Sequence, residues 1–178
     1  MSTQLPSVRR AFHALNRTQQ NHLLSEIYSH SQDMRQLLES RLLHVVDGKA
    51  LIDAMEKETL RKVFHSPIPR TPDGRKVRSI IARAKKLGAE DQTMLDLERL
   101  AFEGFVEFLN EYGGGPESFD EMACDHLETY LRLMKKIHVD EKRYIESIDV
   151  IRRYLRKKNN MITDFLYEVF EKETGTSV

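Results

Sequence analysis

The sequence has a single cysteine, Cys124, in 178 residues, which excludes the disulfide framework that holds many small secreted domains together. It also has no run of the roughly 18 to 20 apolar residues that a membrane-spanning helix needs. The first thirty residues have no continuous apolar stretch of a secretory signal, because Arg9, Arg10 and Arg17 interrupt them. We therefore expect a cytoplasmic protein that does not enter the membrane.

Net charge and strand signals are lacking as well. The chain has 28 basic and 28 acidic residues, and no alternating run of β-branched residues is bounded by turn residues. Apolar residues recur instead every three or four positions, which is typical of helices with one buried face. They make up 40% of the chain, enough for an ordered core. The pattern predicts an all-α protein.

We expect about eight helices in stacked antiparallel hairpins, which form either a short solenoid-like array or an irregular bundle. Local signals predict several helix ends. Thr18 and Ser31 are expected as N-caps and Gly88 as a C-cap, and Ser118 with Glu121 has the spacing of a capping box.

No linker indicates a second domain, so we expect a single helical domain over 1–178. The segment 65–76 holds three of the five prolines and is expected as the main internal loop. Residues 174–178 are expected as a polar C-terminal tail. The helix predicted over 90–112 has an apolar arc of about 240°, which favours a central position.

One stretch of that helix reads Glu103-Gly104-Phe105-Val106-Glu107-Phe108 and is followed by Tyr112-Gly113. This stretch resembles the most recognisable motif of a bacterial family known as domain of unknown function 6155. The basic and aromatic segment 61–67, which ends in proline, and the basic helix 76–86 are similar to further parts of that family's pattern. The loop 68–72 and the break 113–116 depart from it. The resemblance covers residues 5 to 140 and implies an all-helical fold, without an assigned activity or ligand.

Charge is segmented along the chain. Residues 61–88 contain nine bases and one acid, 90–128 contain twelve acids and one base, and 132–158 contain ten bases and four acids. Oppositely charged helices attract across their exposed rims, each surface pair contributing about 0 to 1 kcal/mol. We expect pairing within the molecule. The alternative is that the basic helix binds nucleic-acid phosphates.

Motifs of enzymes and metal sites are missing. No histidine follows a glutamate by three residues, and no two histidines lie four apart, so the common helical metal motifs do not occur. Cys124 is close in sequence to Asp120 and Asp125, which raise a thiol pKa, so an unreactive thiol is expected. Glu103 and Glu107 are expected on a solvated acidic face. We expect no cofactor, no metal and no catalytic residue.

Two polar residues fall within apolar arcs. Glu98 lies in the arc of the helix 90–112, and His126 lies between Phe119, Met122 and Tyr130 on the next helix. A buried carboxylate must be protonated or paired. We therefore expect a structural contact of Glu98 with His126 or with an arginine.

The sequence favours a non-enzymatic helical module that binds an unknown protein partner, and it leaves a homo-oligomer open. The expected contact surface consists of the loop and the adjoining basic helix: Pro67, Pro69, Arg70, Pro72, Arg75, Lys76, Arg78, Arg83 and Lys85. One alternative is a weak nucleic-acid binder that uses 61–88. Another is an enzyme with an unrecognised carboxylate or histidine site, which predicts a concave pocket containing Glu98, Glu103 or His126.

Overall fold

The computed structural model describes residues 4–59, 71–156 and 163–177, and in these ranges it consists of nine α-helices without a strand. In chain order these are α1 (Leu5–Ala14), α2 (Arg17–His30), α3 (Gln32–Leu42), α4 (Gly48–Thr59), α5 (Gly74–Leu87), α6 (Asp91–Tyr112), α7 (Glu117–Lys136), α8 (Glu141–Leu155) and α9 (Thr163–Thr174). The predicted all-α class is confirmed.

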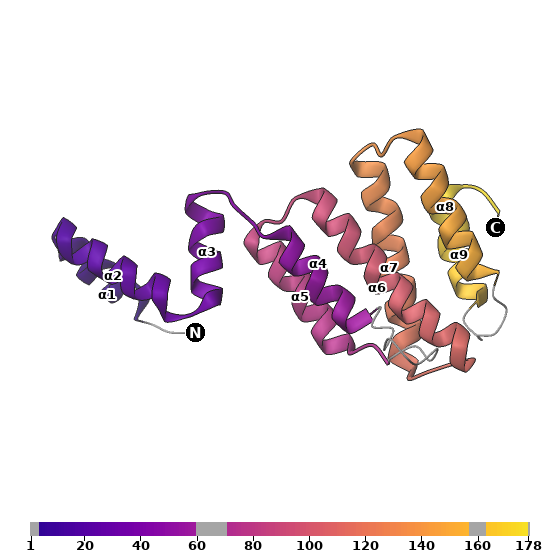
Figure 1. Ribbon diagram of the computed structural model, residues 1–178, viewed down its shortest axis with the longest axis horizontal. Coiled ribbons are helices and arrows are strands. Elements are labelled where there is room, and N and C mark those ends of the chain that lie inside the picture. The colour runs from indigo at the N-terminus through magenta and orange to yellow at the C-terminus, as the bar shows by residue number, and fades with distance from the viewer. Residues whose placement is uncertain (1–3, 60–70, 157–162, 178) are drawn as a thin grey trace. The chain divides into compact units, whose positions relative to one another are not determined.

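The contacts divide the chain into two compact units, unit 1 over 1–46 and unit 2 over 47–178. Figure 1 shows α1 to α3 in unit 1 and α4 to α9 in unit 2. The sequence predicts one domain, because no stretch rich in proline, glycine or serine marks this boundary. Every buried apolar side chain of the described residues lies in unit 2, from Leu51 onward.

Helix starts in unit 1 follow from local hydrogen bonds. Asn16 has extended backbone, its side chain accepts from the Gln19 amide, and the Gln19 side chain accepts from the Asn16 amide. This capping box starts α2 at Arg17, so the predicted N-cap at Thr18 is wrong. Ser31 caps α3 as predicted, with its hydroxyl accepting from an amide of the first turn.

Unit 2 is a helical bundle built around α6. This helix packs against α4, α5, α7 and α8, and α9 packs against α7 and α8 (Figure 1). Because neighbours lie on several sides of it, α6 has thirteen buried residues out of 22. The predicted central position of this helix is confirmed.

Helix ends in unit 2 agree with the sequence in part. Gly88 ends α5 with a left-handed backbone, at a φ of 76°, as predicted. The carboxylate of Asp73 accepts from two amides and starts α5 at Gly74, so the end of the predicted 65–76 loop is helical. The first half of that loop, residues 65–70, lies outside the described residues. The predicted capping box at Ser118 is wrong, because α7 already begins at Glu117 and its N-cap is a proline.

A close approach of α4 and α6 is made possible by Gly104 of α6. A Cβ atom added at this glycine would lie 2.5 Å from Cβ of Thr59 in α4 and 3.0 Å from the Thr59 Cα. Next along α6, Phe105 is fully buried and meets Phe119 edge to face, at 5.0 Å between ring centroids. The motif that carries the family resemblance is therefore a packing centre.

Among the described helices, none is both long enough and apolar enough to span a lipid bilayer.

Candidate functional site

Unit 1 exposes its apolar side chains. Ten of the thirteen large apolar side chains that are exposed among the described residues lie between Leu5 and Val45. In the described part of this unit no apolar side chain is buried, and Ser40 is the buried residue. Large exposed apolar surfaces on otherwise ordered chains mark interaction sites. The candidate site is therefore sought in unit 1.

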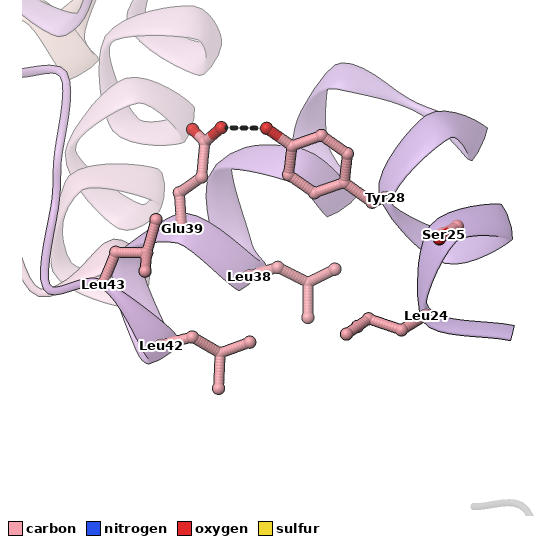
Figure 2. A pocket seen from close by; sticks show the side chains of 7 residues that line it. All are labelled: Leu24, Ser25, Tyr28, Leu38, Glu39, Leu42 and Leu43. Carbon is pink, nitrogen blue, oxygen red and sulfur yellow. Dashed lines mark hydrogen bonds between the residues drawn. The ribbon is translucent and has the colours of Figure 1, made fainter. Parts of the chain in front are cut away.

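An apolar groove lies between α2 and α3. Its cavity of about 320 Å³ is lined by Leu24, Ser25, Tyr28, Leu38, Glu39, Leu42 and Leu43, which we call the α2–α3 groove. In Figure 2 the side chain of Leu24, from α2, points toward those of Leu38 and Leu42, from α3. The leucines thus line a shared space that is open to solvent.

A hydrogen bond joins the two walls of the α2–α3 groove. The Tyr28 hydroxyl donates to Oε1 of Glu39 at 2.5 Å, the dashed line in Figure 2. This bond raises the pKa of Tyr28, and burial and the negative charge of Glu39 act in the same direction. Arg35 lies over the Tyr28 ring, 5.1 Å from its centroid. The groove therefore has leucine walls and one carboxylate at its rim.

This arrangement suits recognition of another helix. Grooves of this kind accept the apolar face of an amphipathic helix, whose anchors recur at i, i+3 or i+4, and i+7. The Glu39 carboxylate at the rim favours a helix with a basic residue beside its apolar stripe.

The predicted contact surface is only partly described. Pro67, Pro69 and Arg70 lie outside the described residues. Pro72 is buried, so its predicted place on an exposed surface is wrong. The remaining members are all exposed along α5: Arg75, Lys76, Arg78, Arg83 and Lys85.

Two of these exposed bases have contacts that show how α5 is held. The Lys76 ammonium lies 3.3 Å from Glu58 of α4, and the Arg78 guanidinium donates to the sulfur of Met122 at 3.8 Å. Lys76 also lies 3.9 Å from Asp73, which precedes α5, so both printed acidic partners lie outside the acidic block 90–128. Pairing between helices at exposed positions contributes about 0 to 1 kcal/mol.

The acidic block pairs with the basic block that follows it. Lys136 of α7 lies 2.8 Å from Asp91 of α6, and Arg143 of α8 lies 3.7 Å from Asp96. The predicted intramolecular pairing is therefore confirmed for the second and third blocks. These contacts hold α7 and α8 against α6 at the rim of the bundle.

The two polar residues of the apolar arcs meet in the core. Nδ1 of His126 lies 2.6 Å from Oε2 of Glu98, and their residues are 9% and 2% exposed. The Phe105 ring stacks parallel to the imidazole, at 5.9 Å between centroids and 4° between planes. The structure thus brings together the pair proposed from the sequence. This buried pair links α6 to α7.

A second cavity, of about 240 Å³, lies between α6, α7 and α8 and includes Glu103 in its lining. Glu103 is 7% exposed, so its predicted place on a solvated face is wrong, because α8 covers this side of α6 as well. Burial raises the pKa of Glu103, although Arg99 opposes the rise. Nη1 of Arg99 donates to both carboxylate oxygens at 3.0 Å, so the carboxylate is already paired.

Tyr154 and Cys124 are two further titratable residues of unit 2 whose pKa is raised. The Tyr154 hydroxyl donates to Glu107 at 3.1 Å, and burial together with Glu103 and Glu107 raises the pKa of this tyrosine. Burial, and then the charges of Asp125 and Asp120, raise the pKa of Cys124 to about 11. Within the ranges that the structure covers, no group of three or more His, Cys, Asp or Glu side chains is placed to hold a metal ion.

The α2–α3 groove has no counterpart among the predictions from sequence. Helical periodicity places Leu24 and Tyr28 on one helix face and Leu38 and Leu42 on the next, but it does not show whether other helices cover them. The available signal was the run Leu42-Leu43, followed by Val45, at a helix end where polar capping residues are usual.

No family model matches the chain, and comparison with curated proteins and with solved structures gives no match either. The resemblance to domain of unknown function 6155 stays a prediction.

Proposed function

We propose that this chain is a non-enzymatic protein-interaction module that holds the apolar face of a partner helix in the α2–α3 groove. The observation that carries the proposal is exposure: Leu42 and Leu43, at the end of the groove, are 62% and 66% exposed. Burying one leucine side chain contributes about 1.5 to 3 kcal/mol, so a partner that covers both gains substantial affinity. This surface replaces the proline-rich loop as the expected main contact.

The size of the groove agrees with this use. At about 320 Å³ it is at the small end of ligand sites, which range from about 300 to 1,000 Å³. Its polar groups are few, and the Tyr28 hydroxyl is already bonded to Glu39. Two or three apolar side chains of a helix fill such a space, with a basic residue placed against Glu39.

A pull-down with matched variants tests the proposal. The tagged full chain serves as bait in its native host's lysate, as wild type, as Leu42→Asp and as Ile145→Asp, each with and without nuclease. Ile145, on α8, is 52% exposed and serves as the control for a new surface charge. A nuclease-resistant partner that is lost only with Leu42→Asp supports the proposal. Partners that the two variants retain equally contradict it.

A direct reading of groove occupancy is also available. The sequence contains no tryptophan, so a Leu43→Trp variant carries a single indole at the groove. Binding of a partner helix buries the indole and shifts its fluorescence to shorter wavelength. The captured partner is expected to cause this shift, and a partner that binds without it occupies another surface.

A second candidate function rests on α5. This helix has six basic residues and no acid between Gly74 and Leu87, and all six are exposed. Such a stripe suits phosphate contacts, which give binding that falls steeply with salt, with a slope of about −0.9 per phosphate. Fluorescence anisotropy with duplex DNA and RNA, on wild type and Arg83→Glu/Lys85→Glu, tests it. A binding affinity that changes neither with salt concentration nor in the variant contradicts this function.

A further inference from the structure

We infer that the helix held in the α2–α3 groove is α1 of a second copy of this chain, so that two chains associate through reciprocal contacts of α1 with the groove. This inference rests on the proposed function, because it assigns an occupant to the same groove. It makes the chain a homodimer through unit 1.

The first argument is the apolar face of α1. Leu5, Val8 and Phe12 stand at i, i+3 and i+7, the spacing of the anchors of a groove-bound helix. They are 54%, 59% and 41% exposed, and α1 has no buried residue. A helix with this stripe on one side has a face that another surface must cover.

The second argument is charge. Arg9 borders the stripe of α1, about 40° from Leu5 at 100° per residue. No acid occurs within Leu5–Ala14, so nothing on α1 repels the Glu39 carboxylate at the rim of the groove. An arginine beside that carboxylate at the edge, and apolar side chains between the leucines, match the polarity of the α2–α3 groove.

The third argument is size. Chains of roughly 40 to 70 residues need disulfides, a metal or association to hold their helices together, because their cores are too small. Unit 1 spans 46 residues and has no cysteine, and the described part has no buried apolar side chain. The ten-residue α1 is shorter than the roughly 12 to 15 residues at which isolated helices become marginally stable. Association through its exposed apolar side chains would therefore stabilise this unit.

Symmetry favours a second copy over a foreign helix. Each chain supplies one α1 and one groove, so a two-fold arrangement fills both grooves and covers both helices at once. The contact then closes on itself and leaves no apolar surface of this kind for further growth. A foreign helix fills the groove and leaves α1 of the same chain exposed.

Sedimentation of the purified full chain over a roughly hundredfold range of concentration tests the inference. We expect a monomer–dimer equilibrium. Val8→Asp and Leu42→Asp are each expected to raise the dissociation constant at least about 100-fold, because each removes two buried apolar contacts per dimer. Ile145→Asp is the control and leaves the equilibrium unchanged. A chain that stays monomeric throughout overturns the inference.

Cross-linking distinguishes contacts between chains from contacts within one chain. Two variants are made in a Cys124→Ser background, so that each contains a single cysteine: Val8→Cys in one and Leu42→Cys, with a mass tag, in the other. After mixing and mild oxidation, the disulfide-linked mixed pair is expected to dominate. A mixture of Ile145→Cys with Leu42→Cys is the control. Equal yields from the two mixtures overturn the inference.

Charge exchange tests the register. Glu39→Arg is expected to weaken the dimer, and Arg9→Glu in the same chain is expected to restore it, because the reversed charges meet across the interface. A double variant no tighter than Glu39→Arg contradicts the proposed register. The two proposals fail separately: a monomer whose groove variant still loses a host partner contradicts only the dimer, whereas a monomer without a groove-dependent partner contradicts both.

Discussion

Helices α1 and α5 have similar amphipathic patterns, but their apolar faces lie in different surroundings. Within unit 2, α5 packs on α4 and α6, and its Val77 and Ile81 are buried. In unit 1, Val8 and Phe12 of α1 are exposed. The sequence pattern thus determines that a helix has an apolar face. Whether the same chain covers that face depends on how many neighbours the fold supplies.

The two units differ in this number of neighbours. In unit 2, α6 contacts four helices, and its side chains are enclosed on several sides. In unit 1, α2 packs mainly against α3. Two helices in contact leave an open seam, because a closed apolar core needs at least a third helix across the groove. In the dimer proposed above, α1 of the other chain is that third helix.

The largest expected difference between the units is in core truncation. Phe105→Ala is expected to lower the free energy of unfolding by about 3 to 5 kcal/mol, because the side chain is fully buried and leaves a cavity. Phe12→Ala, 41% exposed, is expected to lower it by less than about 1 kcal/mol at concentrations where the chain is monomeric. Urea unfolding followed by circular dichroism measures both. Equal losses would remove the contrast between the units.

A smaller effect is expected from the close approach of α4 and α6. Gly104→Ala places a Cβ 2.5 Å from Thr59, so the helices must separate, at a cost of about 1 to 3 kcal/mol. Gly114→Ala is the control, since nothing lies within 4 Å of a Cβ added there. Thermal unfolding of the two variants compares them. A Gly104→Ala protein as stable as the control would mean that this contact is looser than described.

The buried polar pair is expected to contribute somewhat less. Glu98→Gln replaces the carboxylate that faces His126 with an amide and is expected to cost about 1 to 2 kcal/mol, because it disturbs a hydrogen bond in the core. Melting temperatures are measured between pH 5 and pH 8. A variant that matches the wild type throughout this range would show that this contact contributes nothing to stability.

The smallest effect is expected at Glu173, which joins α9 to α7. Burial alone raises its pKa, but hydrogen bonds from Lys135 and Arg132, at 3.1 Å each, outweigh burial and hold the pKa below its ordinary value. A depressed pKa stabilises the folded state above about pH 4.5 and loses this contribution as pH falls through the folded-state pKa. Glu173→Gln is therefore expected to cost about 0.5 to 1 kcal/mol at pH 7 and less near pH 3.

Glu171→Gln, on the exposed side of α9, is the control for Glu173. Urea unfolding at the two pH values measures both variants. A difference between Glu173→Gln and wild type that persists unchanged in acid would show that the charge of Glu173 is not the cause.

Much of the fold was predictable because it depends on local chemistry. Gly88 ends α5 since glycine adopts the left-handed conformation without strain, and Ser31 starts α3 through its hydroxyl. The apolar arc of α6 also placed Glu98 in the core correctly. Thr18 and Ser118 were wrong as caps because residues before them, Asn16 and Pro116, already start the helices.

The candidate site was less predictable because it depends on packing between helices. Glu103 lies off the main apolar arc of α6, and a helical wheel with one buried side places it in solvent. The structure buries it, because α8 covers a further side. The reverse holds in unit 1, where Leu24 and Leu42 have the periodicity of core residues and remain exposed. Periodicity does not show how many other helices pack against a given helix.

Amide hydrogen exchange tests most directly whether the helices of unit 1 are stable only in the dimer while those of unit 2 are equally stable in the monomer. Exchange is measured at two concentrations, one where sedimentation shows monomer and one where it shows dimer. We predict that protection in α1, α2 and α3 rises with association, whereas protection in α5 and α6 is the same at both concentrations. Equal protection of α1 to α3 in the monomer would contradict this account, as would an unprotected α1 in the dimer.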